Sequence, residues 1–95
     1  MKKIAKVRFE QLLEKNPNVV IADMRSPVSY RDGHIPGAIN LPLKNFINKI
    51  MPMPKDTVIV AYSTSFSDVD LVQGINYAEQ LGFTKLHAAE YNTLK

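Results

Sequence analysis

Cysteine is absent from this chain of 95 residues, which also has no tryptophan and only two histidines. Without thiols the chain can form no disulfide, no cysteine-ligated metal site and no covalent intermediate on sulfur. Neither His34 nor His87 has a second ligand at a spacing typical of zinc or iron sites. We therefore expect no metal and no cofactor.

Long apolar segments are also missing. No run can span a membrane, and no apolar segment of a secretory signal follows the N-terminal lysines. The formal charge is +3, and four of the twelve basic residues are Lys2, Lys3, Lys6 and Arg8. Because no basic stripe interleaved with aromatic residues follows them, we interpret them as a solvated terminus. We expect a cytoplasmic protein that binds neither membranes nor nucleic acid.

The residues that are present indicate a folded domain. Hydrophobic residues make up 45% of the chain and charged residues 22%, which is ordinary for a globular protein. A chain of this length supports one modest core. No repeat or linker interrupts it, so the sequence predicts a single domain over residues 1–95.

Apolar runs alternate with helical patterns along the chain. The predicted strands are residues 4–7, 19–22, 38–41, 57–61 and 85–88, and the predicted helices are 9–15, 27–32, 43–51 and 68–81. Ser26 and Gly33 flank the second helix as its cap and its stop. The strand runs are continuously apolar, which is typical of strands buried on both faces. This order predicts an α/β fold, with a parallel five-stranded sheet and helices on both faces.

A polar loop joins the fourth predicted strand to the helix that follows. Its residues are Tyr62, Ser63, Thr64, Ser65, Phe66 and Ser67. A strand, a tight loop and a helix N-terminus can aim backbone N–H groups at one point, where they attract an anion or stabilise a thiolate. Ligands of open α/β sheets also bind at the carboxyl ends of strands. The sequence therefore predicts a site at this loop, although no Cys, His, Lys or Arg lies between Val58 and Tyr77.

Residues 19–43, VVIADMRSPVSYRDGHIPGAINLPL, carry a specific set of motifs. In order they are Asp23-x-Arg25, Pro27, Tyr30, Gly33-His34-Ile35-Pro36-Gly37-Ala38 and Asn40-x-Pro42. The stretch resembles the rhodanese homology domain of the single-domain thiosulfate sulfurtransferases, and a weaker resemblance covers about residues 7–90. It implies a parallel five-stranded sheet with helices on both sides.

In that family a cysteine directly after the fourth strand accepts a sulfane sulfur as a persulfide and passes it on. The resemblance places Tyr62 at the cysteine position, Ser65 at that of a loop glycine and Ser67 at that of the usual arginine. It also places Tyr91 at a glycine position after the last strand. A phenol cannot carry a sulfane sulfur, so we expect Tyr62 to fill the pocket that the cysteine would leave open.

The other family residues have structural interpretations. We expect Asp23 and Arg25 to hydrogen-bond the turn, and His34 to hold that turn together with Gly33, Pro36 and Gly37. Ser67 and Asp70 have the spacing of a capping box, and Asp68 and Asp70 suit the positive end of the helix dipole while repelling an anionic ligand. Phe66 has two open interpretations, an exposed binding anchor or a plug of the vacant pocket.

The sequence therefore predicts a catalytically inactive rhodanese-like domain that works as a binding or regulatory module with an unidentified protein partner. One alternative is an accessory of sulfur transfer that docks a thiol-bearing partner without carrying sulfur. The other is a hydrolase-like enzyme that uses Ser63 or Tyr62 with His34. A serine nucleophile needs an adjacent base, and no histidine is near Ser63 in the sequence.

Overall fold

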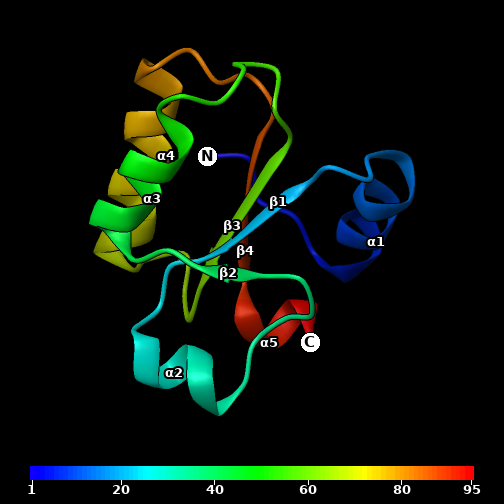
Figure 1. Ribbon diagram of the computed structural model, residues 1–95. Helices are drawn as coiled ribbons and strands as arrows, with labels where there is room; N and C mark the ends of the chain where they lie inside the picture. The colour runs from blue at the N-terminus through cyan, green and yellow to red at the C-terminus, as the bar shows by residue number, and fades with distance from the viewer.

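The structure is a computed structural model of residues 1–95, and its centre is a four-stranded sheet with the order β2-β1-β3-β4 (Figure 1). The strands are β1 (Val20–Asp23), β2 (Ile39–Asn40), β3 (Ile59–Ser63) and β4 (Leu86–Glu90). All three neighbouring pairs are parallel. The predicted α/β class with a parallel sheet is therefore confirmed.

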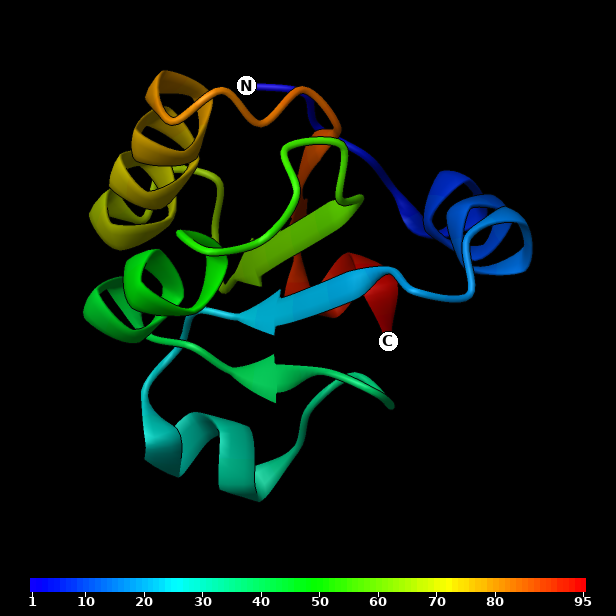
Figure 2. The same ribbon diagram turned by 45° about the horizontal axis from the view of Figure 1, so that its top comes forward.

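Helices cover both faces of this sheet. They are α1 (Lys6–Lys15), α2 (Pro27–Asp32), α3 (Leu43–Ile50), α4 (Val69–Gln80) and α5 (Tyr91–Leu94). Helices α3 and α4 pack side by side on one face, while α1 and α5 lie on the other (Figures 1 and 2). The short α2 lies beyond the carboxyl ends of the strands, next to β2. None of these helices has both the length and the apolarity needed to cross a bilayer.

The prediction of a fifth strand over residues 4–7 is wrong. At this position the chain forms a single parallel bridge, between Lys3 and Ala88, and α1 already begins at Lys6. This segment forms a helix and not a strand because the helix buries Phe9 and Leu12 and leaves Val7 on its outer face, where Val7 is 70% exposed. A strand through residues 4–7 would have needed Val7 in the core.

The predicted ends of the last two strands are too early. β3 continues through Tyr62 and Ser63, which pair with Ala89 and Glu90 of β4. Tyr62 also pairs with Asp23 of β1, so ladder pairing on both sides extends β3 beyond the apolar run. Two members of the predicted loop are therefore strand residues, and β4 ends directly in the one-turn helix α5.

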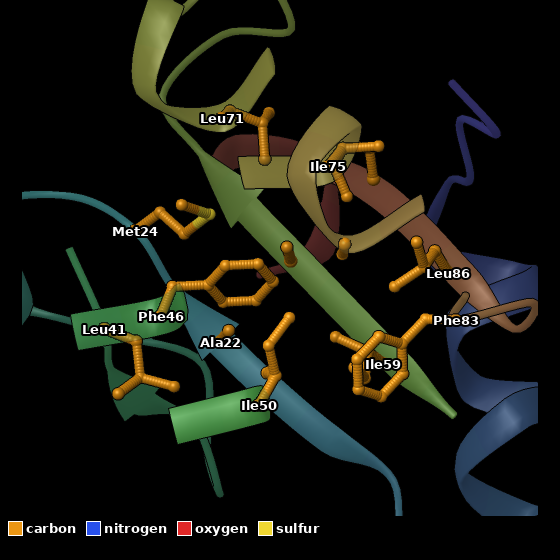
Figure 3. Packing of buried hydrophobic residues seen from close by; sticks show 13 residues of the cluster. Ala22, Met24, Leu41, Phe46, Ile50, Ile59, Leu71, Ile75, Phe83 and Leu86 are labelled. Carbon is orange, nitrogen blue, oxygen red and sulfur yellow. The ribbon is translucent and has the colours of Figure 1, made fainter. Parts of the chain in front are cut away.

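The first hydrophobic cluster fills the space between the sheet and helices α3 and α4. Phe46 of α3 lies against Ala22 of β1, and Leu71 and Ile75 of α4 point toward β3 (Figure 3). Gly74 permits this close approach, because a Cβ there would stand 2.6 Å from Cε of Met24. The buried face of α4 comprises Leu71, Gly74, Ile75 and Ala78. Helical spacing would also put Val72 and Leu81 on the buried stripe of this helix together with Ile75 and Ala78, but both are only half-buried.

The second cluster lies on the opposite face, under α1 and α5. Phe9 and Leu12 of α1 and Leu94 of α5 pack there against Val60 and Tyr62 of β3. Tyr62 is the largest fully buried side chain in the protein. The fold therefore anchors the residue of greatest functional interest inside a core and leaves it no solvent contact.

Candidate functional site

The carboxyl ends of the strands bring four polar residues to one edge of the sheet. These are Asp23 of β1, Asn40 of β2, Ser63 of β3 and Glu90 of β4. Helix α2 and the start of the loop between β3 and α4 lie on the same side (Figure 2). Of the predicted site residues, Asp23, Tyr62 and Ser63 thus lie at the edge where α/β sheets bind ligands, whereas the turn of residues 33–37 leads into the amino end of β2.

Tyr62 stands at the centre of this edge, with 0% of its surface exposed. Its hydroxyl donates a hydrogen bond of 2.7 Å to Oδ2 of Asp23 and accepts one of 3.1 Å from the backbone N–H of Ile35. Burial, followed by the hydrogen bond to Asp23, raises the pKa of Tyr62 above its ordinary value. The phenol is therefore neutral near pH 7 and fully engaged within the protein.

Asp23 is fully buried and is satisfied by Arg25 as well as by Tyr62. Nη2 of Arg25 lies 2.7 Å from Oδ2 of Asp23, and the backbone N–H of Arg25 donates to Oδ1 at 2.9 Å. Nη2 of Arg25 also donates to the carbonyl oxygen of Gly33 at 2.6 Å. The side-chain hydrogen bond to Asp23 raises the pKa of Arg25. This buried pair is locked by charge-assisted hydrogen bonds and holds the turn around Gly33.

Tyr91 of α5 covers this pair from outside. The guanidinium carbon of Arg25 lies 3.8 Å from the centroid of the Tyr91 ring, which stacks on Tyr62 at 5.9 Å. Lys95 adds a second cation at 5.1 Å from the same ring. Sequence reasoning did not identify Tyr91 as a site residue. The available signal was an aromatic residue at a position where the resemblance expects glycine.

The turn that holds the backbone of Ile35 is built by neighbouring residues. His34 is exposed and stacks on Tyr30 with ring centroids 3.7 Å apart, while its Nδ1 lies 2.8 Å from the Tyr30 carbonyl oxygen. Gly37 has a φ of +86°, which a side chain would strain. No hydrogen bond joins His34 to Ser63 or Tyr62. Pro36 is exposed and its side chain makes no polar contact in the turn. The turn is shaped by His34, Tyr30 and Gly37.

At the start of α4, the carboxylate of Asp68 accepts the available hydrogen bonds. Ser63 is fully buried and donates a 2.5 Å hydrogen bond to Oδ2 of Asp68, whose Oδ1 accepts from the backbone N–H of Asp70. Asp68 is therefore the N-cap of α4. The predicted capping box of Ser67 and Asp70 is wrong, because Ser67 turns back to bond the hydroxyl of Ser65.

Glu90 holds the tip of the loop. Its Oε2 accepts a 3.0 Å hydrogen bond from the backbone N–H of Phe66. The Phe66 ring packs against the first cluster, half-buried, and Nζ of Lys3 lies 4.9 Å from its centroid. Thr64 alone in this loop segment is exposed without a hydrogen bond. Sequence reasoning missed Glu90, because only the fold brings it to the loop.

The arrangement leaves no open reaction pocket. Neither Tyr62 nor Ser63 lines any cleft. The nearest cleft has a volume of about 340 Å³ and is bounded by Arg25, Gly33 and Tyr91, which lie outside the buried Tyr62 ring. A serine bonded to a carboxylate and lacking a histidine partner has no general base of the triad type. What the site can do is hold strands, turn and loop in one fixed arrangement.

The model of the "Rhodanese-like domain" family matches residues 6–90. The thiosulfate sulfurtransferase GlpE of Pseudoalteromonas translucida is 38% identical over 87 residues, which covers 83% of this chain and 82% of that protein. The HTH-type transcriptional regulator Rv0324 of Mycobacterium tuberculosis is 41% identical over 44 residues, covering 46% of this chain but only 20% of the regulator.

Solved structures share the fold. The human single-domain sulfurtransferase TSTD1 superposes with a TM-score of 0.76 at 18% identity, covering 98% of this chain and 94% of that one. The rhodanese-like domain of the Alr3790 protein from Anabaena gives a TM-score of 0.73 at 24% identity, covering 95% of this chain and 68% of that one. At these identities the likeness concerns the fold alone.

Proposed function

This chain belongs to the rhodanese-like domain family, and from that membership we propose that it is a catalytically inactive member that works as a binding or regulatory module. The family's sulfur chemistry needs a thiolate, and the chain contains no cysteine. Tyr62 stands at the position that the resemblance assigns to that cysteine.

The observation that carries the proposal is the engagement of the Tyr62 hydroxyl. It lies between Oδ2 of Asp23 and the N–H of Ile35, inside a core with no solvent contact. A group that is buried, neutral and doubly hydrogen-bonded is a structural element and not a nucleophile.

The electrostatics of the loop support the same proposal. A thiosulfate anion would need free N–H donors and a cation at the start of α4. Here Glu90 accepts from the N–H of Phe66, and Asp68 accepts from Ser63 and from Asp70. These internal carboxylates repel an anionic donor and compete for the same donors.

A regulatory role has separate support from the comparisons. Part of this chain is similar to a segment of a protein named as a transcriptional regulator. A segment similar to part of this chain can thus occur within a regulator. By extension, we propose a protein partner for this chain.

A second candidate is an accessory of sulfur transfer that docks a thiol-bearing partner without carrying sulfur. The 38% identity to a thiosulfate sulfurtransferase favours it, because a shared surface can keep a shared partner after the chemistry is lost. The hydrolase alternative gains no such support, since Ser63 donates to Asp68 and His34 is engaged with Tyr30.

Two measurements on the purified chain test the proposal. Thiocyanate formation from thiosulfate and cyanide, and hydrolysis of p-nitrophenyl esters and phosphates, are expected to stay at the rate of buffer alone. Turnover above that rate, abolished by Tyr62→Phe or Ser63→Ala, would contradict it. Titration with a sulfur-carrier protein in persulfide and reduced forms then separates the candidates. The accessory requires saturable binding that prefers the persulfide form, and the regulatory module does not.

A further inference from the structure

Four basic side chains line one cleft at the end of the sheet opposite Tyr62. The cleft has a volume of about 290 Å³, and its basic residues are Lys2, Arg8, Lys85 and His87. They come from the N-terminal segment, α1, the loop before β4, and β4 itself. In Figure 1 the loops that enter β3 and β4 lie at the top of the molecule, whereas α2 lies at the bottom. This cleft is therefore separate from the candidate site.

No acidic residue offsets these charges within the cleft. The two ion pairs of the protein join Arg25 to Asp23 and Arg31 to Asp32, and neither is part of this surface. The remaining lining residues are Leu12, Asn16, Val58 and Thr84, all uncharged. Cations that converge without a partner repel one another, and an anion between them would relieve that repulsion.

His87 shows how close these charges are. It is only 4% exposed, and its Nδ1 makes a long contact of 3.4 Å with the carbonyl oxygen of Ile59. Burial, followed by the nearby charges of Lys2 and Arg8, lowers the pKa of His87. The imidazole thus lies within the field of cations from two other elements.

We propose that this cleft binds the phosphate group of a small phosphorylated molecule. Lysine and arginine are the preferred partners of phosphate, the first as a compact charge and the second through its planar pair of donors. The Thr84 hydroxyl has no hydrogen-bond partner within the chain and adds a neutral donor at the rim. The lost catalytic chemistry is not needed for this inference, so failure of either proposal leaves the other standing.

The shape and lining of the cleft favour a small ligand over a nucleic acid. Its volume is close to the lower end for small-molecule sites, which are typically about 300–1,000 Å³. No aromatic residue lines it, whereas proteins that bind single strands stack bases on aromatic rings. An adjoining cleft of about 300 Å³ shares Asn16, Val58 and Lys85, and its other lining residues include the charged Lys15 and Asp56 and the neutral polar Asn18 and Thr57. The rest of the ligand is therefore polar, as in a sugar phosphate.

Binding is expected to depend on pH through His87. The groups that face its ring are Lys2, Arg8, Lys85 and the carbonyl of Ile59. A bound phosphate anion stabilises the imidazolium, so phosphate raises the pKa of His87.

An NMR titration at constant ionic strength, with inorganic phosphate replacing chloride, tests the proposal. We expect saturable shifts at Arg8, Thr84, Lys85 and the His87 ring, and an upward shift of the His87 titration. The double variant R8Q/K85Q should weaken binding by about tenfold or more, since each lost cation removes a charge-assisted contact. The matched control K44Q/K49Q removes two charges from α3 and should bind within about twofold of wild type. Thermal unfolding verifies that both variants are folded.

Two further probes identify the rest of the ligand. Ribose 5-phosphate should bind more tightly than inorganic phosphate, because its hydroxyls reach the adjoining polar cleft, and phenyl phosphate should not. Shifts that never saturate, or equal weakening in K44Q/K49Q, would mean diffuse attraction to net charge and overturn the proposal. A single-stranded RNA oligonucleotide that binds this cleft more tightly than ribose 5-phosphate would also overturn it, in favour of a nucleic-acid surface.

Discussion

The hydroxyl of Tyr62 and the carboxylate of Asp23, 39 positions apart in sequence, are joined by a 2.7 Å hydrogen bond at the carboxyl ends of two paired strands. The same hydroxyl accepts from Ile35 in the turn before β2. One side chain therefore ties β3 to β1 and to that turn. At the position where the resemblance to the family expects a reactive thiol, this chain has a structural cross-link.

We predict that Tyr62→Phe destabilises the protein without unfolding it. The change leaves the Ile35 N–H without its acceptor and removes one donor from buried Asp23, at a cost of about 1–3 kcal/mol. Urea denaturation monitored by circular dichroism measures the change in unfolding free energy. Tyr77→Phe is the control, because Tyr77 is 38% exposed on α4 and its hydroxyl makes no hydrogen bond, so its effect should stay below about 0.5 kcal/mol. Equal stability of the two variants would show that the cross-link contributes nothing.

The raised pKa of Tyr62 predicts a loss of stability in alkali. In the unfolded chain this phenol releases its proton near its ordinary pKa of about 10, while the folded protein retains it. The unfolded state then binds fewer protons than the native state, so stability falls as the pH rises above about 10, by up to about 1.4 kcal/mol per pH unit. Below that pH the contribution is complete.

The difference between wild type and Tyr62→Phe isolates this effect from the titration of lysines. Unfolding free energies measured from about pH 8 to pH 11 should show the advantage of wild type shrinking only at the alkaline end. Parallel curves over the whole range would mean that the phenol titrates alike in both states.

Local chemistry explains which elements the sequence could predict. The apolar runs of β1 and β3 and the cap of α2 depend on neighbours in sequence. Ser26 accepts from the N–H of Ser29 as its position before Pro27 predicts, and Gly33 follows the end of that helix. The prediction of a fifth strand was wrong because its outcome depends on tertiary packing and not on sequence neighbours. A short apolar segment near the N-terminus fits a strand or a helix equally well, and only the burial of Phe9 and Leu12 decides.

The residues of the candidate site also divide into those that the sequence could identify and those that it could not. Tyr62, Asp23 and Arg25 could be singled out because they match a family motif. The roles of Tyr91 and Glu90 could not, since both depend on contacts that only the fold creates, of Tyr91 with Arg25 and of Glu90 with the loop after β3. The choice between Ser67 and Asp68 as N-cap likewise depends on where β3 ends, because buried Ser63 donates a hydrogen bond to Asp68.

We predict that Tyr62→Cys alone recovers little sulfurtransferase activity. The thiol would face buried Asp23, which disfavours a thiolate, and the loop supplies Ser67 and Asp68 where an anionic donor needs a cation. Losing the ring also leaves a cavity under Tyr91 and costs about 2–4 kcal/mol of stability. Thiocyanate formation by the folded variant measures the outcome, with GlpE of Pseudoalteromonas translucida as the reference. Turnover comparable to that reference would show that only the thiol was missing.

The last prediction concerns anions at the loop between β3 and α4. Asp68 and Asp70 place two negative charges in the first turn of α4, and Glu90 accepts the N–H of Phe66. Each carboxylate repels a bound anion a few ångströms away by about a few kcal/mol in a partly hydrated site. This repulsion exceeds the attraction from the roughly half positive charge at the helix N-terminus. Sulfate, phosphate and thiosulfate should therefore bind this loop only at millimolar concentrations or weaker.

Amide shifts of residues 63–67 report this site separately from the basic cleft. In wild type they should not saturate below millimolar sulfate. The triple variant S67R/D68S/E90Q adds one cation and removes two carboxylates while keeping a serine cap, so sulfate should bind it at least about tenfold more tightly and with a stronger salt dependence. The variant S67R alone is the matched control, because it adds the cation but leaves the carboxylates in place. If S67R binds as tightly as the triple variant, repulsion by Asp68 and Glu90 is not what closes this site to anions.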